Sequence, residues 1–371
     1  MTATPDADAL ASTLLTAPVP SLREESGGCK YKSALNSLSS RPPAMETTTN
    51  TADRLGAASL GASELAGAAQ VELAAGSLGG RPGLLGTAGD YLALTKPRII
   101  GLLLVTTVTT MLVADPAGPG MATILWTVLG GYLAAGGAGA VNHYVERERD
   151  AQMDRTCARP LVAGRIDPRR GLGFGVFLIV VATAQLALTV NVLAAGLALA
   201  GFLGYVFVYT LWLKPRTPQN IVIGGAAGAV PPLVGWAAAT GGLSWDALYP
   251  FTIVFLWTPP HFWALALLVK DDYARARVPM LPVARGELAT RRQIVAYTVA
   301  LIAFSALPYV TGLLGGLYLA AALALGVGFL ALAVRLLLRP SHRAAVAVHL
   351  GSLAYLALLF SAMAIDRGVV Q

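Results

Sequence analysis

Four oxygen-bearing side chains recur at every fourth position of one segment: Asn142, Glu146, Asp150 and Asp154. The segment, NHYVERERDAQMDRTCARPL over residues 142–161, follows more than twenty residues without a charged side chain. Residues four apart share a helix face, so a continuous helix places all four on a stripe about 18 Å long. Carboxylate and carboxamide oxygens suit Mg²⁺, which also binds substrate phosphates. The spacing therefore predicts a site for a divalent ion.

A second acidic cluster begins at Lys270 in the segment KDDYARARVPMLPVARGE, with Asp271, Asp272, Tyr273 and Arg275 close together. Two acidic clusters with interleaved arginines can hold Mg²⁺ and a diphosphate between them, because carboxylates bind the ion while the ion and arginine neutralise phosphate oxygens. The alternative is an interfacial loop whose charges are solvated or paired with each other. A diphosphate bound where apolar segments end favours an isoprenoid diphosphate as substrate.

The elements that must position these clusters are apolar. Only 13% of the 371 residues are charged, and the mean hydropathy is +0.63. Repeated apolar stretches of roughly 20 residues are each long enough to cross a hydrocarbon core of about 30 Å. We expect an all-α, polytopic membrane protein with spans near 99–115, 121–142, 172–190, 192–213, 220–240, 246–269, 293–312, 314–335 and 345–364. The span at 220–240 is rich in glycine and contains Pro231 and Pro232, which favours a kinked, closely packed helix or a ligand contact.

Residues 1–88 are rich in Ala, Ser, Thr, Gly and Pro and have no sustained periodicity, so we expect a disordered tail before a single membrane domain over 89–371. The tail lacks the pattern of a signal peptide, and Met45 is a candidate translation start. The two cysteines, Cys29 and Cys157, match no metal or redox spacing and are assigned no role.

The net charge of +7 is distributed in a way that favours topology over nucleic-acid binding. Lysines and arginines gather before the first span, between spans two and three, four and five, and six and seven, and before span nine. The intervening loops near 116–120, 191, 241–245 and 313 have none. By the positive-inside rule, the N-terminus and both acidic clusters face the cytoplasm of a cell-membrane protein.

From about Tyr91 onward the chain resembles the intramembrane, UbiA-type prenyltransferase superfamily. The segments that carry the resemblance are LTKPRI at 94–99, residues 142–161, YTLWLKPRTPQNIVIGGAAGAVPPLVGW at 209–236 and LWTPPHFWALALLVKDDYARARVPMLP at 256–282. TPPHFWALAL followed by DDYARA is similar to the branch that prenylates haem. The resemblance implies nine helices around a central cavity, with an Asp-rich motif after helix two and another after helix six. Glu146 stands where the superfamily commonly has Asp, and Glu also occurs there in the haem branch.

The resemblance also implies a reaction: farnesyl diphosphate and haem b give haem O and diphosphate, with Mg²⁺ as cofactor and haem as substrate. Metal-binding and catalytic roles then fall to Asn142, Glu146, Asp150, Asp271 and Asp272, with Asp154 as a further metal ligand. Candidate contacts to the diphosphate or the haem propionates are Arg155, Arg159, Lys214, Lys270, Tyr273 and Arg275. Haem A synthase or terminal oxidase assembly factors are the candidate protein partners, in addition to the lipid bilayer.

His261 lies inside an apolar span, where an ionisable residue indicates function by default. It either contacts haem, through the iron or a propionate, or satisfies backbone groups freed by Pro259 and Pro260. Two other functions also stay open: a prenyltransferase with a quinone-precursor or chlorophyll-type acceptor, and a carrier of haem or isoprenoid without covalent chemistry. A carrier needs no divalent ion and consumes no farnesyl diphosphate, so a metal-dependent turnover assay separates these alternatives.

Overall fold

The computed structural model describes residues 84–369, and these residues form helices and connecting loops without a strand. Nine helical segments within this range are long and apolar enough to cross a membrane. They are Pro97–Ala114, Met121–Asp150, Pro168–Thr189, Val192–Leu213, Asn220–Thr240, Trp245–Leu268, Gly286–Val310, Gly316–Leu338 and His342–Gly368. Each matches one predicted span, so the prediction of an all-α polytopic fold is confirmed.

The elements are α4 (Leu84–Thr95), α5 (Pro97–Ala114), α6 (Met121–Asp150), α7 (Pro168–Thr189), α8 (Val192–Leu203), η1 (Gly204–Leu213), α9 (Asn220–Gly228), α10 (Val230–Thr240), η2 (Trp245–Ala247), α11 (Leu248–Leu268), α12 (Lys270–Arg275), α13 (Leu281–Ala284), α14 (Gly286–Ser305), α15 (Leu307–Val310), α16 (Gly316–Leu338) and α17 (His342–Val369). Residues 84–88, which we placed in the tail, are helical because α4 begins at Leu84. The rest of the predicted tail, with Met45 and Cys29, lies outside the described residues.

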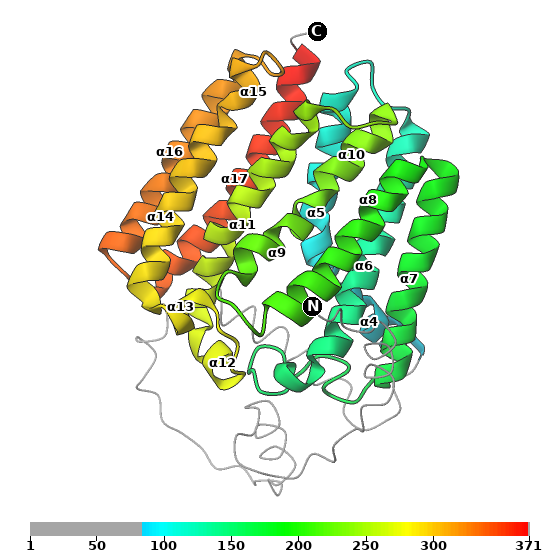
Figure 1. Cartoon of the computed structure of the whole chain (residues 1–371), viewed down its shortest axis with the longest axis vertical. Coiled ribbons are helices and arrows are strands. Elements are labelled where there is room, and N and C mark those ends of the chain that lie inside the picture. Colours follow the sequence, from blue (N-terminus) through cyan, green and yellow to red (C-terminus); the bar gives the residue numbers. More distant parts are fainter. Residues whose placement is uncertain (1–83, 370–371) are drawn as a thin grey trace, which may run out of the picture.

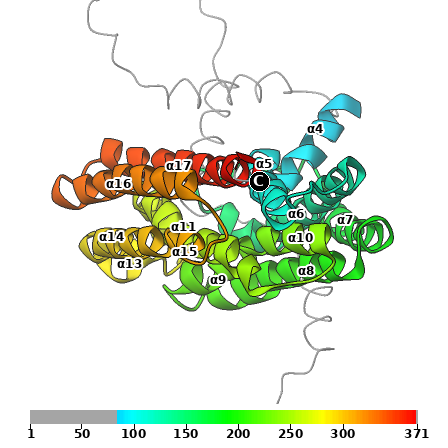
Figure 2. The same ribbon diagram turned by 90° about the horizontal axis from the view of Figure 1, so that it is seen from above.

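The long helices form two rows that run nearly parallel (Figures 1 and 2). One row holds α16, α17, α5, α6 and α7, and the other holds α14, α11, α9 with α10, and α8. Contacts of α16 with α14, α17 with α11 and α5 with α10 join the rows, while α7 and α8 meet at one side. This arrangement lets helices far apart in the sequence share one end of the bundle.

Small residues allow the closest helix contacts. A Cβ atom added to Gly137 in α6 would lie 2.8 Å from the carbonyl oxygen of Gly175 in α7. One added to Gly235 in α10 would lie 2.3 Å from the carbonyl oxygen of Thr107 in α5. Inside a lipid bilayer the hydrophobic effect does not drive helices together, so their association depends on van der Waals contacts, and glycines allow the backbones to come close enough to make them. Gly235 thus gives the glycine-rich span its predicted close packing, and the span breaks at Ala229 between α9 and α10, just before its two prolines.

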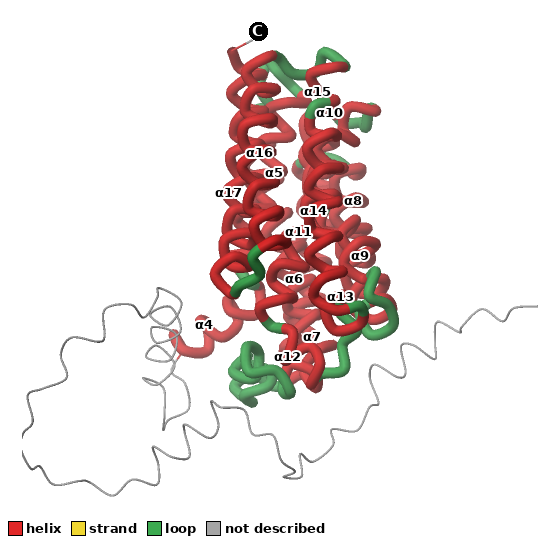
Figure 3. The backbone as a smooth tube through the Cα atoms, turned by 90° about the vertical axis from the view of Figure 1, so that its left-hand side faces the viewer, coloured by secondary structure: helices red, strands yellow, loops and turns green. Residues whose placement is uncertain are grey.

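Loops and short helices are concentrated at the end of the bundle that carries α12 and α13, drawn at the bottom of Figures 1 and 3. The loop 151–167, α4 and the end of α6 lie at the same end, which we call the charged end. The C-terminal end of α17 lies at the opposite end. Both acidic clusters thus meet at one face, as the distribution of lysine and arginine predicts.

Candidate functional site

The stripe predicted on the second span is real for three of its four members. Asn142, Glu146 and Asp150 lie on α6 and are 2%, 3% and 1% exposed. The helix ends at Asp150, so Asp154 lies in the following loop and its side chain is 40% exposed. Our expectation of one continuous stripe of four is therefore wrong at Asp154, because the chain turns away after Asp150 rather than continuing as a helix.

The segment η1 supplies a second row of polar groups that faces α6. It is a π-helix, with its hydrogen bonds widened to five residues: the amide of Lys214 donates to the carbonyl oxygen of Tyr209. The side-chain NH2 group of Asn142 donates to the hydroxyl of Thr210 over 3.3 Å. The Lys214 ammonium lies 2.5 Å from a Glu146 carboxylate oxygen. Two residues four apart on α6 thus pair with Thr210 on η1 and with Lys214, the residue that follows η1.

Asp150 pairs with a residue of the loop that follows it. Its carboxylate accepts a hydrogen bond from the guanidinium of Arg159, whose side chain is 19% exposed. The hydroxyl of Thr156 donates to the backbone carbonyl oxygen of Asp150 over 2.9 Å and holds the turn against the helix end. The charge of this buried carboxylate is therefore balanced by a side chain nine residues along the chain.

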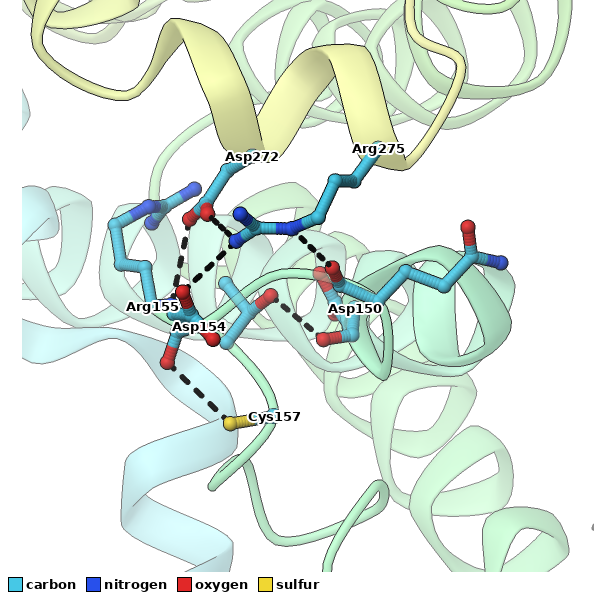
Figure 4. A network of polar contacts seen from close by, with 8 residues as sticks. Asp150, Asp154, Arg155, Cys157, Asp272 and Arg275 are labelled. Carbon is cyan, nitrogen blue, oxygen red and sulfur yellow. Dashed lines mark hydrogen bonds and ion pairs between the residues drawn. The ribbon is translucent and has the colours of Figure 1, made fainter. Parts of the chain in front are cut away.

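The helix α12 brings the second acidic cluster against the same loop (Figure 4). The guanidinium of Arg275 donates to the carboxylates of Asp272 and Asp154, the latter over 2.8 Å. A carboxylate oxygen of Asp272 also accepts the backbone N–H of Arg155 over 3.4 Å. The predicted meeting of the two clusters is thus seen in the structure, through Asp272 and Arg275 on one side and the 151–167 loop on the other.

Several predicted site residues lie at the margin of this arrangement. Asp271 and the side chain of Arg155 are exposed, and no ion pair to either is found within residues 84–369. Lys270 forms an exposed ion pair with Glu287 of α14 over 2.7 Å, outside the buried part of the site. Tyr273 is 6% exposed and packs in the hydrophobic core. The assignments of these four side chains to substrate or metal stay predictions.

Lys96 is a site residue that the sequence analysis did not select. It precedes α5 in a left-handed backbone conformation, with φ of 57°, and its ammonium donates to the carboxamide oxygen of Asn142 over 2.7 Å. A non-glycine residue at positive φ is uncommon, and residues held in such conformations cluster at functional sites. The available signal was the LTKPRI segment, in which this lysine precedes a proline at the start of the first span.

Lysines at the charged end differ in their electrostatic environment. Burial and the nearby Arg159 lower the pKa of Lys96 to about 7 against the opposing effect of Glu146. Burial also opposes the charge of Lys214, yet the adjacent Glu146 carboxylate raises the pKa of Lys214 above its ordinary value. One lysine is therefore a permanent cation, whereas the other changes its charge near neutral pH.

The site suits Mg²⁺ by its donor chemistry rather than by a ready-made cluster. Within the described residues, no group of three or more His, Cys, Asp or Glu side chains surrounds a common point. The carboxylates of Glu146, Asp150 and Asp272 instead each hold a basic side chain. These hard oxygen donors, together with Asn142, fit a magnesium ion. Their basic partners, Lys214, Arg159 and Arg275, have long, flexible side chains of the kind that also bond to phosphate oxygens.

His261 lies apart from the charged cluster, inside α11. Its Nδ1 is 2.7 Å from the hydroxyl oxygen of Ser352 on α17, and the residue is 8% exposed. Its ring stacks on Trp257, with 4.4 Å between ring centroids. The ring therefore bonds to the neighbouring helix rather than to backbone groups near Pro259 and Pro260, which disfavours the backbone-satisfying role.

Known proteins are similar to this chain in sequence and, in other cases, in fold. The chain is 53% identical over 292 residues to a Protoheme IX farnesyltransferase from Roseiflexus sp. (strain RS-1), covering 79% of this chain and 54% of that protein. It is 51% identical over 278 residues to a protein of the same name from Alkalilimnicola ehrlichii, covering 75% of this chain and 92% of that one. The chain thus spans about half the length of the Roseiflexus relative.

Solved structures show the same arrangement of helices at much lower identity. A digeranylgeranylglyceryl phosphate synthase superposes with a TM-score of 0.64 at 17% identity, over 76% of this chain and 99% of that one. A UbiA homolog from Archaeoglobus fulgidus, solved with DMAPP and Mg²⁺, gives 0.56 at 15% identity, over 74% and 99%. The family model of the UbiA prenyltransferase family matches residues 103–360. The chain belongs to the UbiA prenyltransferase family.

Proposed function

We propose that this protein transfers the farnesyl group of farnesyl diphosphate to the 2-vinyl group of haem b. The bond between farnesyl C1 and the diphosphate oxygen breaks, and its electron pair leaves with diphosphate. The vinyl group attacks the allylic cation at C1 to form a carbon–carbon bond. Water then adds to the new cation with loss of a proton, which gives haem O.

One observation carries the diphosphate half of this proposal: buried carboxylates at the charged end are each matched to a buried or half-buried basic side chain. The pairs are Glu146 with Lys214 and Asp150 with Arg159. Burying a charged group costs free energy, and pairing it with an opposite charge offsets only part of that cost. Several buried ion pairs at one place therefore indicate a binding function rather than a contribution to stability. A magnesium diphosphate needs both kinds of group, carboxylates for the ion and cations for the phosphate oxygens.

The roles of the chain's own residues follow from these pairs. Asn142, Glu146 and Asp150 would hold one ion, and Asp272 from α12 would face a second from the other side. Lys214, Arg159 and Lys96 would contact the diphosphate and stabilise the negative charge that grows on it as the bond to C1 breaks. Bound Mg²⁺ supplies Lewis-acid neutralisation of the same charge.

The acceptor half of the proposal is supported by similarity. The relatives that are about half identical to this chain carry the name Protoheme IX farnesyltransferase. We propose in addition that the charged end faces the cytoplasm of the cell membrane, because the loops at that end carry the lysines and arginines. Haem A synthase or assembly factors of terminal oxidases are the proposed protein partners.

The test is an assay in membranes with haem b, farnesyl diphosphate and Mg²⁺, with and without EDTA, read by mass spectrometry. We expect a haem product heavier by one farnesyl group and one water molecule, formed only with the metal. Metal-dependent prenylation of a quinone precursor instead of haem would keep the diphosphate site and discard the haem acceptor. If folded protein prenylates no acceptor, the carrier function is favoured.

Variants at both acidic clusters locate the site. Asp150→Ala and Asp271→Ala should each abolish turnover while membrane insertion is kept. Asp246 lies in η2 at the start of α11, whereas α12 follows the end of α11, so the length of this helix separates Asp246 from the charged end. Asp246→Ala is therefore the control and should keep full activity. An Asp150→Ala, Asp271→Ala double variant that turns over without Mg²⁺ would overturn the site assignment.

A further inference from the structure

A second polar cluster lies between α11 and α17, outside the diphosphate site. The imidazole of His261 stacks with two aromatic rings: its centroid lies 4.4 Å from the ring centroid of Trp257 and 4.4 Å from that of His349. The rings are close to parallel, with interplanar angles of 16° and 24°. A third ring, that of Phe262, lies edge-to-face with the imidazole at 5.2 Å between centroids, so aromatic contacts restrict how the imidazole turns.

One edge is fixed by Ser352. This serine is fully buried, and its hydroxyl donates to the backbone carbonyl oxygen of His349 over 2.6 Å. A hydroxyl has a single proton, so the same oxygen must accept the hydrogen bond from Nδ1 of His261 at 2.7 Å. The indole N–H of Trp257 donates a hydrogen bond to the backbone carbonyl oxygen of Ser352 over 2.7 Å, which fixes the position of the serine relative to α11.

The tautomer of His261 follows from this accounting. With the proton on Nδ1, the lone pair of the neutral ring lies on Nε2. No hydrogen-bond partner for Nε2 is found within the described part of the chain, although the residue is only 8% exposed. A buried imidazole that donates from one nitrogen and keeps a free lone pair on the other is the arrangement of a metal-ligating histidine with its supporting acceptor.

We propose that Ser352 is a positioning residue that holds His261 with its Nε2 lone pair directed at the iron of the haem substrate. This inference rests on the proposed function, because haem is the acceptor there. The serine acts by fixing the tautomer and ring orientation, and its acceptor oxygen increases the basicity of the ligand. His349 and Trp257 keep the ring from turning. The charged end and this ring would then hold the two substrates of one reaction at separate places.

The experiment uses the full chain in lipid nanodiscs with ferric haem b, followed by electron paramagnetic resonance and by titration of the haem absorption band. We expect one imidazole nitrogen on the iron in the wild type. Ser352→Ala should weaken haem binding by about 10-fold and disturb the iron signal, the usual scale for loss of a supporting contact. Ser352→Thr should restore both, because its hydroxyl can make the same two contacts. His261→Ala should lose the nitrogen signal and regain it with added imidazole.

Tyr355→Phe is the matched structural control. Tyr355 lies on the same helix and its hydroxyl makes a buried contact of 3.1 Å with Ser305 of α14, away from His261. Loss of that contact should leave the iron signal and haem affinity unchanged. Farnesyl diphosphate binding should be equal in all these variants.

Two results would overturn the inference: a folded Ser352→Ala variant with wild-type iron signal and haem affinity, or a wild type that binds haem with no nitrogen on the iron. In either case a farnesylated haem product from the same preparation would leave the proposed function standing. A wild type that prenylates no haem would instead remove the proposed function, and this inference with it.

Discussion

Buried carboxylates occur at both ends of the bundle, but their partners differ. At the charged end, Glu146 and Asp150 are paired with the side chains of Lys214 and Arg159. At the opposite end, Asp366 is fully buried and accepts the backbone N–H groups of Gly315, over 2.5 Å, and Tyr318, over 3.0 Å. Asp366 thereby satisfies amides at the start of α16 that have no partner within the helix.

The comparison shows that burial alone does not identify a functional carboxylate. Backbone amides at a helix start are fixed in place, so the bonds of Asp366 have no alternative arrangement and serve stability. Lysine and arginine side chains have several rotatable bonds, so the partners of Glu146 and Asp150 can move to a phosphate while the carboxylates accept an ion. The mobility of the partner therefore separates a binding site from a helix cap.

The largest expected effect is at the charged end. Asp150→Asn keeps the size of the side chain and removes its charge, so kcat/KM for farnesyl diphosphate should fall by about 1,000-fold, the scale of losing one electrostatic group in a site without water. The free energy of unfolding should change little, because Arg159 can reach solvent. Steady-state kinetics and thermal unfolding of the same preparation measure both. Unchanged kinetics would show that Asp150, like Asp366, stabilises the fold and takes no part in the reaction.

The converse variant is at the opposite end. Asp366→Ala leaves the buried N–H of Tyr318 and the part-buried N–H of Gly315 without an acceptor, and it should lower the free energy of unfolding by about 2 to 3 kcal/mol. Asp366→Asn retains one acceptor oxygen and should lose less. Activity per folded molecule should be that of the wild type in both. A loss of specific activity with intact stability would contradict a purely structural role for Asp366.

A smaller effect should come from Lys96, whose charge changes near neutral pH. Because its pKa in the free protein is about 7, Lys96 is mostly cationic at pH 6 and mostly neutral at pH 8.5. A bound diphosphate favours the cation and raises this pKa, so binding should take up close to one proton at pH 8.5 and almost none at pH 6. Affinity should fall as pH rises above about 7.

Calorimetry in two buffers of different ionisation enthalpy measures this proton uptake. Lys96→Met is expected to remove it, and the difference from the wild type excludes protons exchanged by the diphosphate itself. Lys96→Arg should bind without uptake, because arginine stays charged at both pH values. Equal uptake in the wild type and in Lys96→Met would show that another group is responsible.

The smallest effect is expected at Lys270, which pairs with Glu287 on the surface. Lys270→Met should change kcat and KM by less than about twofold, because exposed ion pairs contribute little and this pair lies outside the buried cluster. Lys214→Met is the comparison, and we expect it to be severely impaired because it leaves Glu146 buried without its cation. A large rise in KM for Lys270→Met would place Lys270 in the substrate site, as its sequence position predicted.

Much of the fold was determined by the sequence alone. Apolar length sets the nine spans, since a helix must cover the hydrocarbon core, and the distribution of lysine and arginine placed both acidic clusters at one end. The four-residue spacing also placed Asn142, Glu146 and Asp150 on one face of α6, because the helix repeat is a local property. Local signals failed at Asp154, where the turn after Asp150 depends on contacts of the loop with the rest of the protein.

Only the tertiary structure decided which charges pair. Asn142 meets Lys96 and Thr210, which lie 46 and 68 residues away, and His261 meets Ser352 at a separation of 91 residues. The LTKPRI segment marks Lys96 but does not show that it contacts Asn142, and nothing in the segment around Ser352 predicts its contact with His261. Helix periodicity determines which side chains share a face of one helix. Which other helix lies against that face depends on how the nine apolar helices pack together. That packing depends on small residues such as Gly137 and Gly235, and so on the chain as a whole.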